Sequence, residues 1–122
     1  MMNPFLQVAL GGAAGAVARY GVNRATMAVL GPGFPVATLI VNVVGSFLMG
    51  LLVVLLATRG NAWAPLLMTG ALGGFTTFSA FSLDALTLWQ RGQHGAAAAY
   101  VLLSVGLSLS AIVAGLAVGR AA

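Results

Sequence analysis

The chain has no cysteine and no lysine, and it has a single acidic residue, Asp84. Without cysteine, the sequence excludes a disulfide scaffold, a thiolate metal site and a cysteine nucleophile. A lone carboxylate cannot form a pair of acidic groups for general acid–base catalysis. The one histidine, His94, lies in a polar turn, where we expect it to face solvent. We therefore find no catalytic set and predict that the protein is not an enzyme.

Charge of either sign is scarce. Charged residues make up 5% of the 122 residues and hydrophobic residues 61%, whereas soluble domains carry about 25% charged residues. The net charge of +4 comes from arginines that lie far apart, so they do not form the clustered basic surface of a nucleic-acid site. These arginines are Arg19, Arg24, Arg59, Arg91 and Arg120. The composition predicts one unit, residues 1–122, that lies in a lipid bilayer.

Four apolar stretches are long enough to cross a membrane as helices, which takes about 20 residues. They cover residues 4–27, 35–58, 63–89 and 96–119. The connections between them are short, so we expect neighbouring helices to be antiparallel. The glycines of residues 11–15 favour close helix packing, because no strand precedes them as in a nucleotide-binding loop. The predicted fold class is an all-α membrane protein with four transmembrane helices per subunit.

The centre of the third stretch is unfavourable for a helix. Paired glycines at 73–74 are followed by paired threonines at 76–77, and both are poor helix formers. A break near residues 73–77 would free backbone groups that protein or water must satisfy, since lipid offers no partners. Such a break would line a cavity or bind a ligand. The alternative is an intact helix in which Gly70 and Gly74 form a packing face.

The arginines give the chain almost no preferred orientation in a membrane. Arg24 and Arg91 lie at one end of the predicted helices, and Arg59 and Arg120 lie at the other. The positive-inside rule is then balanced, which predicts insertion in both directions and pairing of two opposed copies. The alternative is that a small bias fixes one orientation.

Two predicted helices carry polar side chains at steps of four residues, which places each set on one helical face. The second stretch has Thr38, Asn42 and Ser46, and their spacing alone favours hydrogen bonds between helices. The fourth stretch has a line of three hydroxyl groups that could donate to an anion as it loses water. These are Tyr100, Ser104 and Ser108. The alternative for the serines is a bond to the preceding turn of their own helix.

Phe78 and Phe81 lie three residues apart, just after the suspected break. An aromatic ring has a positive edge, so edges that point into a pore would offer weak positive potential to an anion. Ordinary packing is the alternative, and it is the one that these two residues favour by themselves.

Three stretches of sequence are similar to one known family. They read GGAAGAVARY at residues 11–20, TLIVNVVGSF at 38–47 and GGFTTFSAFS at 73–82. The sequence resembles the Fluc-type fluoride channels, also called the CrcB family, over nearly the whole chain. The resemblance implies an antiparallel dual-topology homodimer with two pores, a third helix broken at the midplane, and fluoride export that relieves fluoride toxicity. It also implies a location in the cell (inner or plasma) membrane.

The resemblance further implies roles for individual residues. Backbone carbonyls of Gly73 and Thr76 would hold a structural sodium ion between the subunits, and Arg19 would lie near the aqueous vestibule. We expect a branched side chain at Gly73 to disfavour the broken geometry. The fluoride pore would be lined by Asn42, Phe78, Phe81, Tyr100, Ser104 and Ser108, and we place Thr38 and Ser82 in it as well.

The chain departs from the family pattern at two positions. Asp84 stands where some relatives carry glutamate, which leaves its role open, and Ala80 stands where threonine or serine is frequent. Two other functions fit a small helical membrane protein. A proton-coupled drug exporter needs a carboxylate embedded in the membrane, and the first stretch has none. An assembly subunit that transports nothing would use its polar faces only to join helices.

Overall fold

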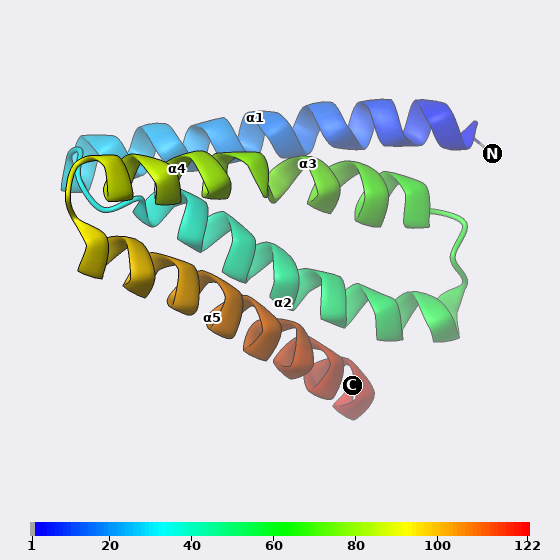
Figure 1. Ribbon diagram of the computed structural model, residues 1–122. Helices are drawn as coiled ribbons and strands as arrows, with labels where there is room; N and C mark the ends of the chain where they lie inside the picture. Colours follow the sequence, from blue (N-terminus) through cyan, green and yellow to red (C-terminus); the bar gives the residue numbers. More distant parts are fainter. Residues whose placement is uncertain (1) are drawn as a thin grey trace.

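The computed structural model describes residues 2–122, and the regular elements in this part of the chain are all helices, joined by short loops. Figure 1 shows long helices that run back and forth, each reversing the direction of the one before. The elements are α1 (Pro4–Leu30), α2 (Val36–Arg59), η1 (Pro65–Leu72), α3 (Gly73–Phe75), α4 (Ser79–Gln90) and α5 (His94–Ala121). The antiparallel order predicted from the short connections is confirmed.

Local sequence sets the two ends of α1. Asn3 caps its start, where the Phe5 N–H donates to Asn3 Oδ1 at 2.7 Å, and Pro4 occupies the first turn, where a missing N–H costs nothing. The helix stops at Gly31, whose φ of 74° lies in the left-handed region that glycine tolerates best. α1 therefore ends three residues beyond the predicted stretch 4–27.

Three helical segments are long and apolar enough to cross a membrane, by length and composition alone. They are Val36–Arg59, Pro65–Gln90 and His94–Ala121. α1 has 27 residues, about the length that a span needs, but it is not among them. Its polar side chains, Gln7, Arg19 and Arg24 among them, lower its apolar character. A fourth transmembrane helix stays a prediction.

The third long segment is interrupted, as the glycine–threonine run suggested. α3 ends at Phe75 and α4 begins at Ser79, and between them Thr76 adopts an extended conformation with ψ of 162°. η1, which leads into α3, is a π-helix, a feature that the sequence did not indicate. The interruption lies at residues 76–78, at the C-terminal edge of the predicted 73–77.

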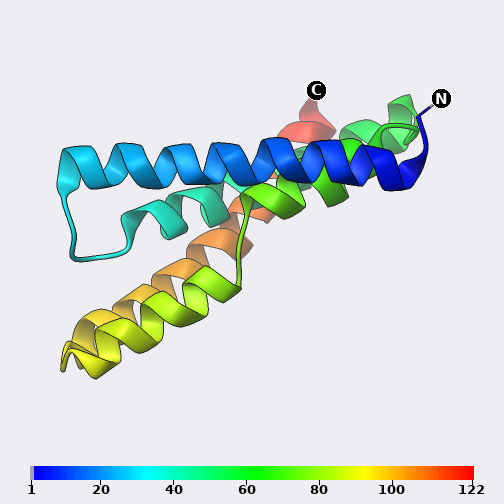
Figure 2. The ribbon, with the colours of Figure 1, turned by 90° about the horizontal axis from the view of Figure 1, so that it is seen from above.

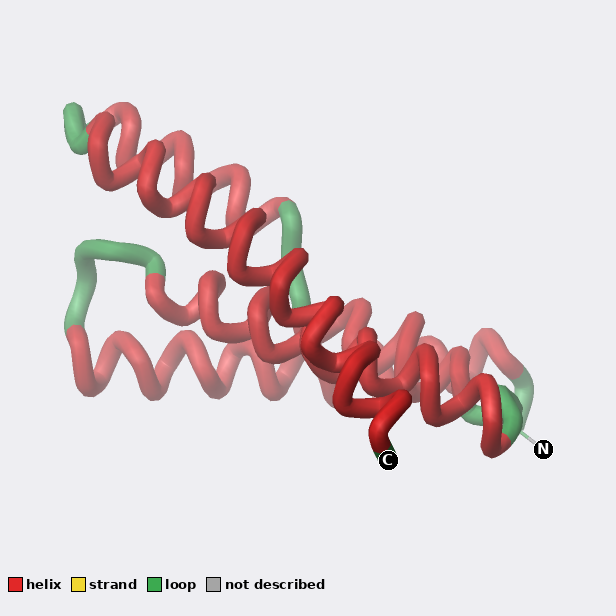
Figure 3. The backbone as a smooth tube through the Cα atoms, turned by 90° about the horizontal axis from the view of Figure 1, so that it is seen from below, coloured by secondary structure: helices red, strands yellow, loops and turns green. Residues whose placement is uncertain are grey.

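The break lets one segment pack against two different partners. η1 and α3 lie along α1, whereas α4 packs on α5 and, to a lesser extent, on α2. Figure 2 shows α4 displaced from α1 across the extended stretch, and Figure 3 shows that stretch as a non-helical connection between helical segments. In the part of the chain that the structure describes, α4 does not pack against α1.

Glycines set the close approach of the helices. A Cβ atom at Gly11 or Gly15 of α1 would overlap backbone atoms of Leu66 and Ala71 in η1, so only hydrogen fits there. On the other side of this contact, a Cβ at Gly74 would lie 2.6 Å from the Gly12 carbonyl oxygen. The close packing predicted for residues 11–15 is therefore confirmed. The alternative of an intact helix is wrong, because the segment is interrupted after Phe75. Gly70 and Gly74 nevertheless form the packing face that this alternative gave them, since a Cβ at either would meet backbone atoms of α1.

The buried apolar core is small and lies between α4 and α5, where Phe81, Leu88, Ala97 and Tyr100 form one cluster. Most large apolar side chains are exposed instead; Phe5 is 88% exposed and Leu102 is 73% exposed. An exterior this apolar is what lipid or a partner subunit would cover.

Candidate functional site

The helix break is held by a side chain from α2. The Thr77 N–H donates to Asn42 Oδ1 at 2.8 Å, and Asn42 Nδ2 donates to the Thr77 carbonyl oxygen at 3.0 Å. The Asn42 amide thus satisfies both the N–H and the carbonyl group of Thr77, which in a continuous helix would bond to other backbone groups. The second Nδ2–H of the amide is left over for another acceptor.

Two further contacts complete the break. The Ala80 N–H donates to Thr77 Oγ1 at 3.1 Å, which caps the start of α4. From α1, Arg19 Nε donates to the Gly74 carbonyl oxygen at 3.1 Å. The family resemblance implied that Arg19 lies near the aqueous vestibule. Arg19 does line a cavity of about 210 Å³, which Tyr20 and Asn23 of the same helix also line. Its bond to the break was not predicted.

The break leaves the carbonyl oxygens of Gly73 and Thr76 without a hydrogen-bond donor in the described part of the chain. In a continuous helix they would accept from the N–H groups of Thr77 and Ala80. Those N–H groups donate to Asn42 and to the Thr77 hydroxyl instead. Two oxygens with partial negative charge are therefore free at the end of α3.

The backbone of Gly73 is itself helical, with φ of −62° and ψ of −37°. The expectation that a branched side chain there would disfavour a broken geometry is therefore wrong; the residue with extended backbone is Thr76. A Cβ at Gly73 would meet only the Met68 carbonyl oxygen, at 3.7 Å, which is an ordinary contact. Within one chain, Gly73 has room for a side chain.

A groove of about 360 Å³ brings together most of the residues that were predicted to line a pore. Its walls come from α2, the break, α4 and α5. Among its lining residues are Asn42, Ser46, Phe78, Phe81, Ser104 and Ser108. Residues that lie more than 60 positions apart in the sequence, such as Asn42 and Ser104, thus face one space.

The two serines of α5 present free hydroxyl groups to this groove. Ser104 Oγ and Ser108 Oγ are buried and have no hydrogen-bond partner among the described residues. The alternative of a bond within their own helix is therefore wrong for this pair. That alternative does describe Ser82, which is exposed, donates to the Phe78 carbonyl oxygen at 3.0 Å and does not line the groove.

Aromatic rings form a row beside the groove. The ring centroids of Phe78 and Phe81 are 5.4 Å apart, those of Phe81 and Tyr100 are 5.3 Å apart, and those of Tyr100 and Phe34 are 5.5 Å apart. Phe78 is 76% exposed at the mouth of the groove, and Phe81 is buried. Phe34, from the loop between α1 and α2, was not singled out in the sequence.

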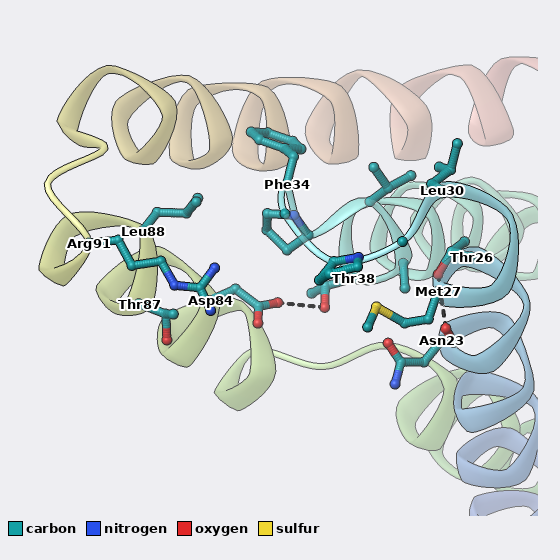
Figure 4. Close-up of a pocket in the computed structure, with 16 residues that line it drawn as sticks. Asn23, Thr26, Met27, Leu30, Phe34, Thr38, Asp84, Thr87, Leu88 and Arg91 are labelled. Atoms are coloured by element: carbon teal, nitrogen blue, oxygen red, sulfur yellow. Dashed lines mark hydrogen bonds between the residues drawn. The ribbon is translucent and has the colours of Figure 1, made fainter.

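Thr38 and Tyr100 do not line this groove; both meet Asp84. Thr38 Oγ1 donates to Asp84 Oδ2 at 2.7 Å, and the Tyr100 hydroxyl donates to the same oxygen at 3.1 Å. Figure 4 shows the bond between Thr38 and Asp84 at a cavity of about 220 Å³ that lies among α1, the following loop, α2 and α4. The predicted hydroxyl line therefore divides between Tyr100 and Ser104.

Gln7 is a buried polar residue that was not singled out from the sequence. Its side chain is 1% exposed; Oε1 accepts from the Leu66 N–H at 3.2 Å and Nε2 donates to the Met2 carbonyl oxygen at 3.0 Å. A lone amide in an apolar stretch could have marked it, as one did for Asn42. It ties the start of α1 to the start of η1.

His94 is the first residue of α5, directly after the turn of residues 91–93, and it is exposed and stacked on Trp89, with 3.9 Å between the ring centroids. No group of three histidine, cysteine, aspartate or glutamate side chains that could hold a metal ion occurs among the described residues.

Known proteins match almost the entire sequence. The family described as "CrcB-like protein, Camphor Resistance (CrcB)" matches residues 6–116. A relative from Cereibacter sphaeroides is 68% identical over 98% of this chain and 97% of its own length. Relatives from Paracoccus denitrificans and Agrobacterium fabrum are 61% and 56% identical; they cover 98% and 93% of this chain, and 97% and 93% of their own lengths. All three carry the name "Fluoride-specific ion channel FluC".

Proposed function

The chain belongs to the CrcB-like protein family, and on this premise we propose that it is a fluoride-selective ion channel in a membrane. The relatives' shared name supports the ion and the channel activity, which is not an enzyme class. The three long apolar segments support a multi-pass membrane protein. The single observation that carries the proposal is the pair of buried, unpartnered hydroxyls of Ser104 and Ser108 in a groove.

The chemistry of that groove suits a small, strongly hydrated anion. Fluoride must receive hydrogen bonds as its water leaves, and conduction needs sites weak enough to release it. Neutral donors meet both needs: the two serine hydroxyls, and the spare Nδ2–H of Asn42. The edges of Phe78 and Phe81 add weak positive potential. No arginine lines this groove, so no buried cation would trap the ion.

We extend the proposal to the assembly and its physiology. The functional unit would be an antiparallel homodimer of four-helix subunits with two pores, in the cell (inner or plasma) membrane. The balanced arginines support insertion in both directions. The exposed apolar side chains leave ample surface for lipid and for a second subunit. Fluoride that accumulates in the cytoplasm would leave through the pores down its gradient, which would relieve its toxicity.

We also propose a structural sodium ion between the subunits, held by the carbonyl oxygens of Gly73 and Thr76. The two oxygens lack donors among the described residues, and a hard cation prefers oxygen ligands, so the residues present fit the ion. Its positive charge would neutralise the free end of the α3 dipole. The ion would join subunits and would take no part in moving fluoride.

The decisive experiment measures ion efflux from liposomes that contain only the purified protein. We expect fast fluoride efflux, read with a fluoride electrode, and chloride efflux at the level of protein-free liposomes. Equal efflux of the two anions would contradict selectivity. Absence of fluoride efflux from correctly folded, reconstituted protein would leave an assembly subunit as the better interpretation.

Removing a groove hydroxyl is expected to slow fluoride. Ser108→Ala should reduce flux about fivefold, since one neutral hydrogen bond contributes about 1 kcal/mol. Ser110→Ala is the matched control, because Ser110 is exposed on the same helix and does not line the groove. Flux through liposomes should fall for the first variant and stay unchanged for the second. If both variants conduct like the unmodified protein, the groove is not the pore.

The sodium proposal predicts that Gly73→Val damages the dimer and spares the subunit. Gly73 has room within its own chain, so helix content should be normal, while a side chain at the ion site should weaken association. Replacing sodium by a large organic cation should weaken the unmodified dimer too. A sodium concentration of 100 times Kd would stabilise the dimer by about 2.7 kcal/mol, and this stabilisation would be lost. Dimer dissociation and fluoride flux are the measurements.

Thr76→Ser serves as the control for this site, because it keeps both the carbonyl and the hydroxyl that donates to the Leu72 carbonyl oxygen. We expect it to dimerise and conduct normally. Dimer stability and flux that both survive thorough sodium removal would contradict the proposed ion.

A further inference from the structure

Asp84 gathers two hydroxyl groups from two other helices onto one of its oxygen atoms. Thr38 of α2 and Tyr100 of α5 both donate to Asp84 Oδ2, at 2.7 Å and 3.1 Å. Tyr100 is fully buried, and Asp84 is the only acidic residue in the chain. A buried tyrosine is thus fixed by the single side chain that carries negative charge.

This arrangement withholds donors from other anions. A hydroxyl group has one proton to donate, and here both protons point at a carboxylate. Hydrogen bonds to an ionised acceptor are roughly twice as strong as neutral ones. An anion that is to use the Thr38 or Tyr100 hydroxyl must therefore accept a hydrogen bond well enough to displace a carboxylate oxygen. Fluoride, with its compact charge, is a strong acceptor; chloride, which is larger and more diffuse, is a weak one.

The carboxylate also stands where an anion would pass. Asp84 and Thr38 line both the 220 Å³ cavity drawn in Figure 4 and the 210 Å³ cavity on the side of Arg19, so their hydrogen bond lies in a shared wall. Thr77, of the break, lines the second of these cavities and the groove. The three spaces therefore adjoin through shared lining residues, and Asp84 lies between the first two.

The charges around Asp84 explain why a negative group is useful there. Arg91, one residue beyond the end of α4, lines the 220 Å³ cavity, and Arg19 of α1 lines the 210 Å³ cavity. Without Asp84, the two cavities would be lined only by cationic and neutral groups and would attract any anion, including chloride. A carboxylate in their shared wall offsets that attraction and leaves passage to the ion that competes best for the hydroxyls.

We propose that Asp84 is a selectivity residue: its carboxylate competes with the permeating anion for the hydroxyl protons of Thr38 and Tyr100, and thereby admits fluoride and excludes chloride. This inference rests on the proposed fluoride channel and adds a role that the groove residues do not supply. It predicts that neutralising Asp84 makes the protein faster and less selective at once.

The test compares Asp84→Asn and Asp84→Glu with the unmodified protein in liposomes at constant neutral pH. Asparagine keeps the shape and accepts the two hydroxyl bonds more weakly, so fluoride efflux should rise about threefold to tenfold and chloride efflux should rise clearly above the leak of protein-free liposomes. Glutamate keeps the charge and should keep chloride at the leak level. Adding Tyr100→Phe to Asp84→Asn should remove part of the gain, because one released donor is gone.

The outcomes separate this inference from the proposed function. If the unmodified protein passes no fluoride, both fail. If it passes fluoride and Asp84→Asn leaves the ratio of fluoride to chloride efflux unchanged, or lowers fluoride efflux without admitting chloride, only the role of Asp84 is overturned. If Asp84→Asn yields no folded protein, Asp84→Ser takes its place with the same expected result.

Discussion

Asn42→Leu is expected to abolish fluoride flux and to lower the thermal stability of the folded protein. Leucine has a similar size but offers no partner to the Thr77 N–H and carbonyl group, which Asn42 now satisfies at 2.8 and 3.0 Å. Leaving a buried backbone group unsatisfied costs about 1–3 kcal/mol, and lipid cannot supply a substitute. The variant also loses the spare Nδ2–H that Asn42 presents to the groove.

Ser46→Ala provides the matched control for Asn42→Leu. Ser46 lies one turn further along α2 and lines the same groove, but it makes no hydrogen bond to the break. Its loss should reduce flux modestly and leave the melting temperature unchanged. Thermal unfolding in detergent and fluoride efflux from liposomes are the two measurements. A normal melting temperature for Asn42→Leu would mean that the break holds its shape without the amide.

Asn42 also marks how far the sequence could be interpreted. An amide in an apolar helix must find a partner, so its importance was predictable from residue type alone. The glycine and threonine pairs likewise indicated a break within a few residues of its actual place. That the amide and the break belong together was not predictable, because the two lie 35 residues apart and spacing along one helix says nothing about a partner on another.

The hydroxyl line shows the same limit in a different form. A step of four residues correctly placed Tyr100, Ser104 and Ser108 on one side of α5, since helical geometry fixes that relation. It could not reveal that Tyr100 donates to Asp84 while the serines stay free, because this depends on how α4 leans on α5 after the break. From the sequence alone, the role of Asp84 therefore stayed open.

Features without a periodic signal were missed altogether. The π-helix of η1 differs from an α-helix by its hydrogen-bond spacing, and its composition is that of any apolar helix. Gln7, which bonds to the first turn of η1, gave no pattern that repeats. Polar residues of α1 bind η1 and the break: Gln7 accepts from Leu66, and Arg19 donates to Gly74. The same polar residues make α1 less apolar than the other long segments.

The largest structural effect is expected from Gly15→Val, which should yield little or no folded protein. A Cβ at Gly15 would overlap the Ala71 carbonyl oxygen and lie 2.8 Å from the Phe75 backbone nitrogen. Both atoms belong to the backbone of η1 and α3, so a change of side-chain rotamer cannot relieve the overlap. α1 must therefore move away from η1. We expect a loss of about 3 kcal/mol or more, at the upper end of what overpacking costs. Moving α1 would also pull Arg19 from the Gly74 carbonyl oxygen at the break.

Gly21→Val is the control on the same helix, because a Cβ at Gly21 meets nothing within 4 Å in the chain. The two variants share the intrinsic cost or benefit of valine in a helix, so their difference isolates the contact between α1 and η1. The yield of monodisperse protein after detergent extraction and its thermal unfolding are the measurements. Comparable yield and melting temperature for the two variants would mean that α1 does not pack on η1 through Gly15. In that case the contact at Gly15 would not be what holds Arg19 at the break. Another contact would have to hold Arg19 in the cavity that it lines together with Asp84.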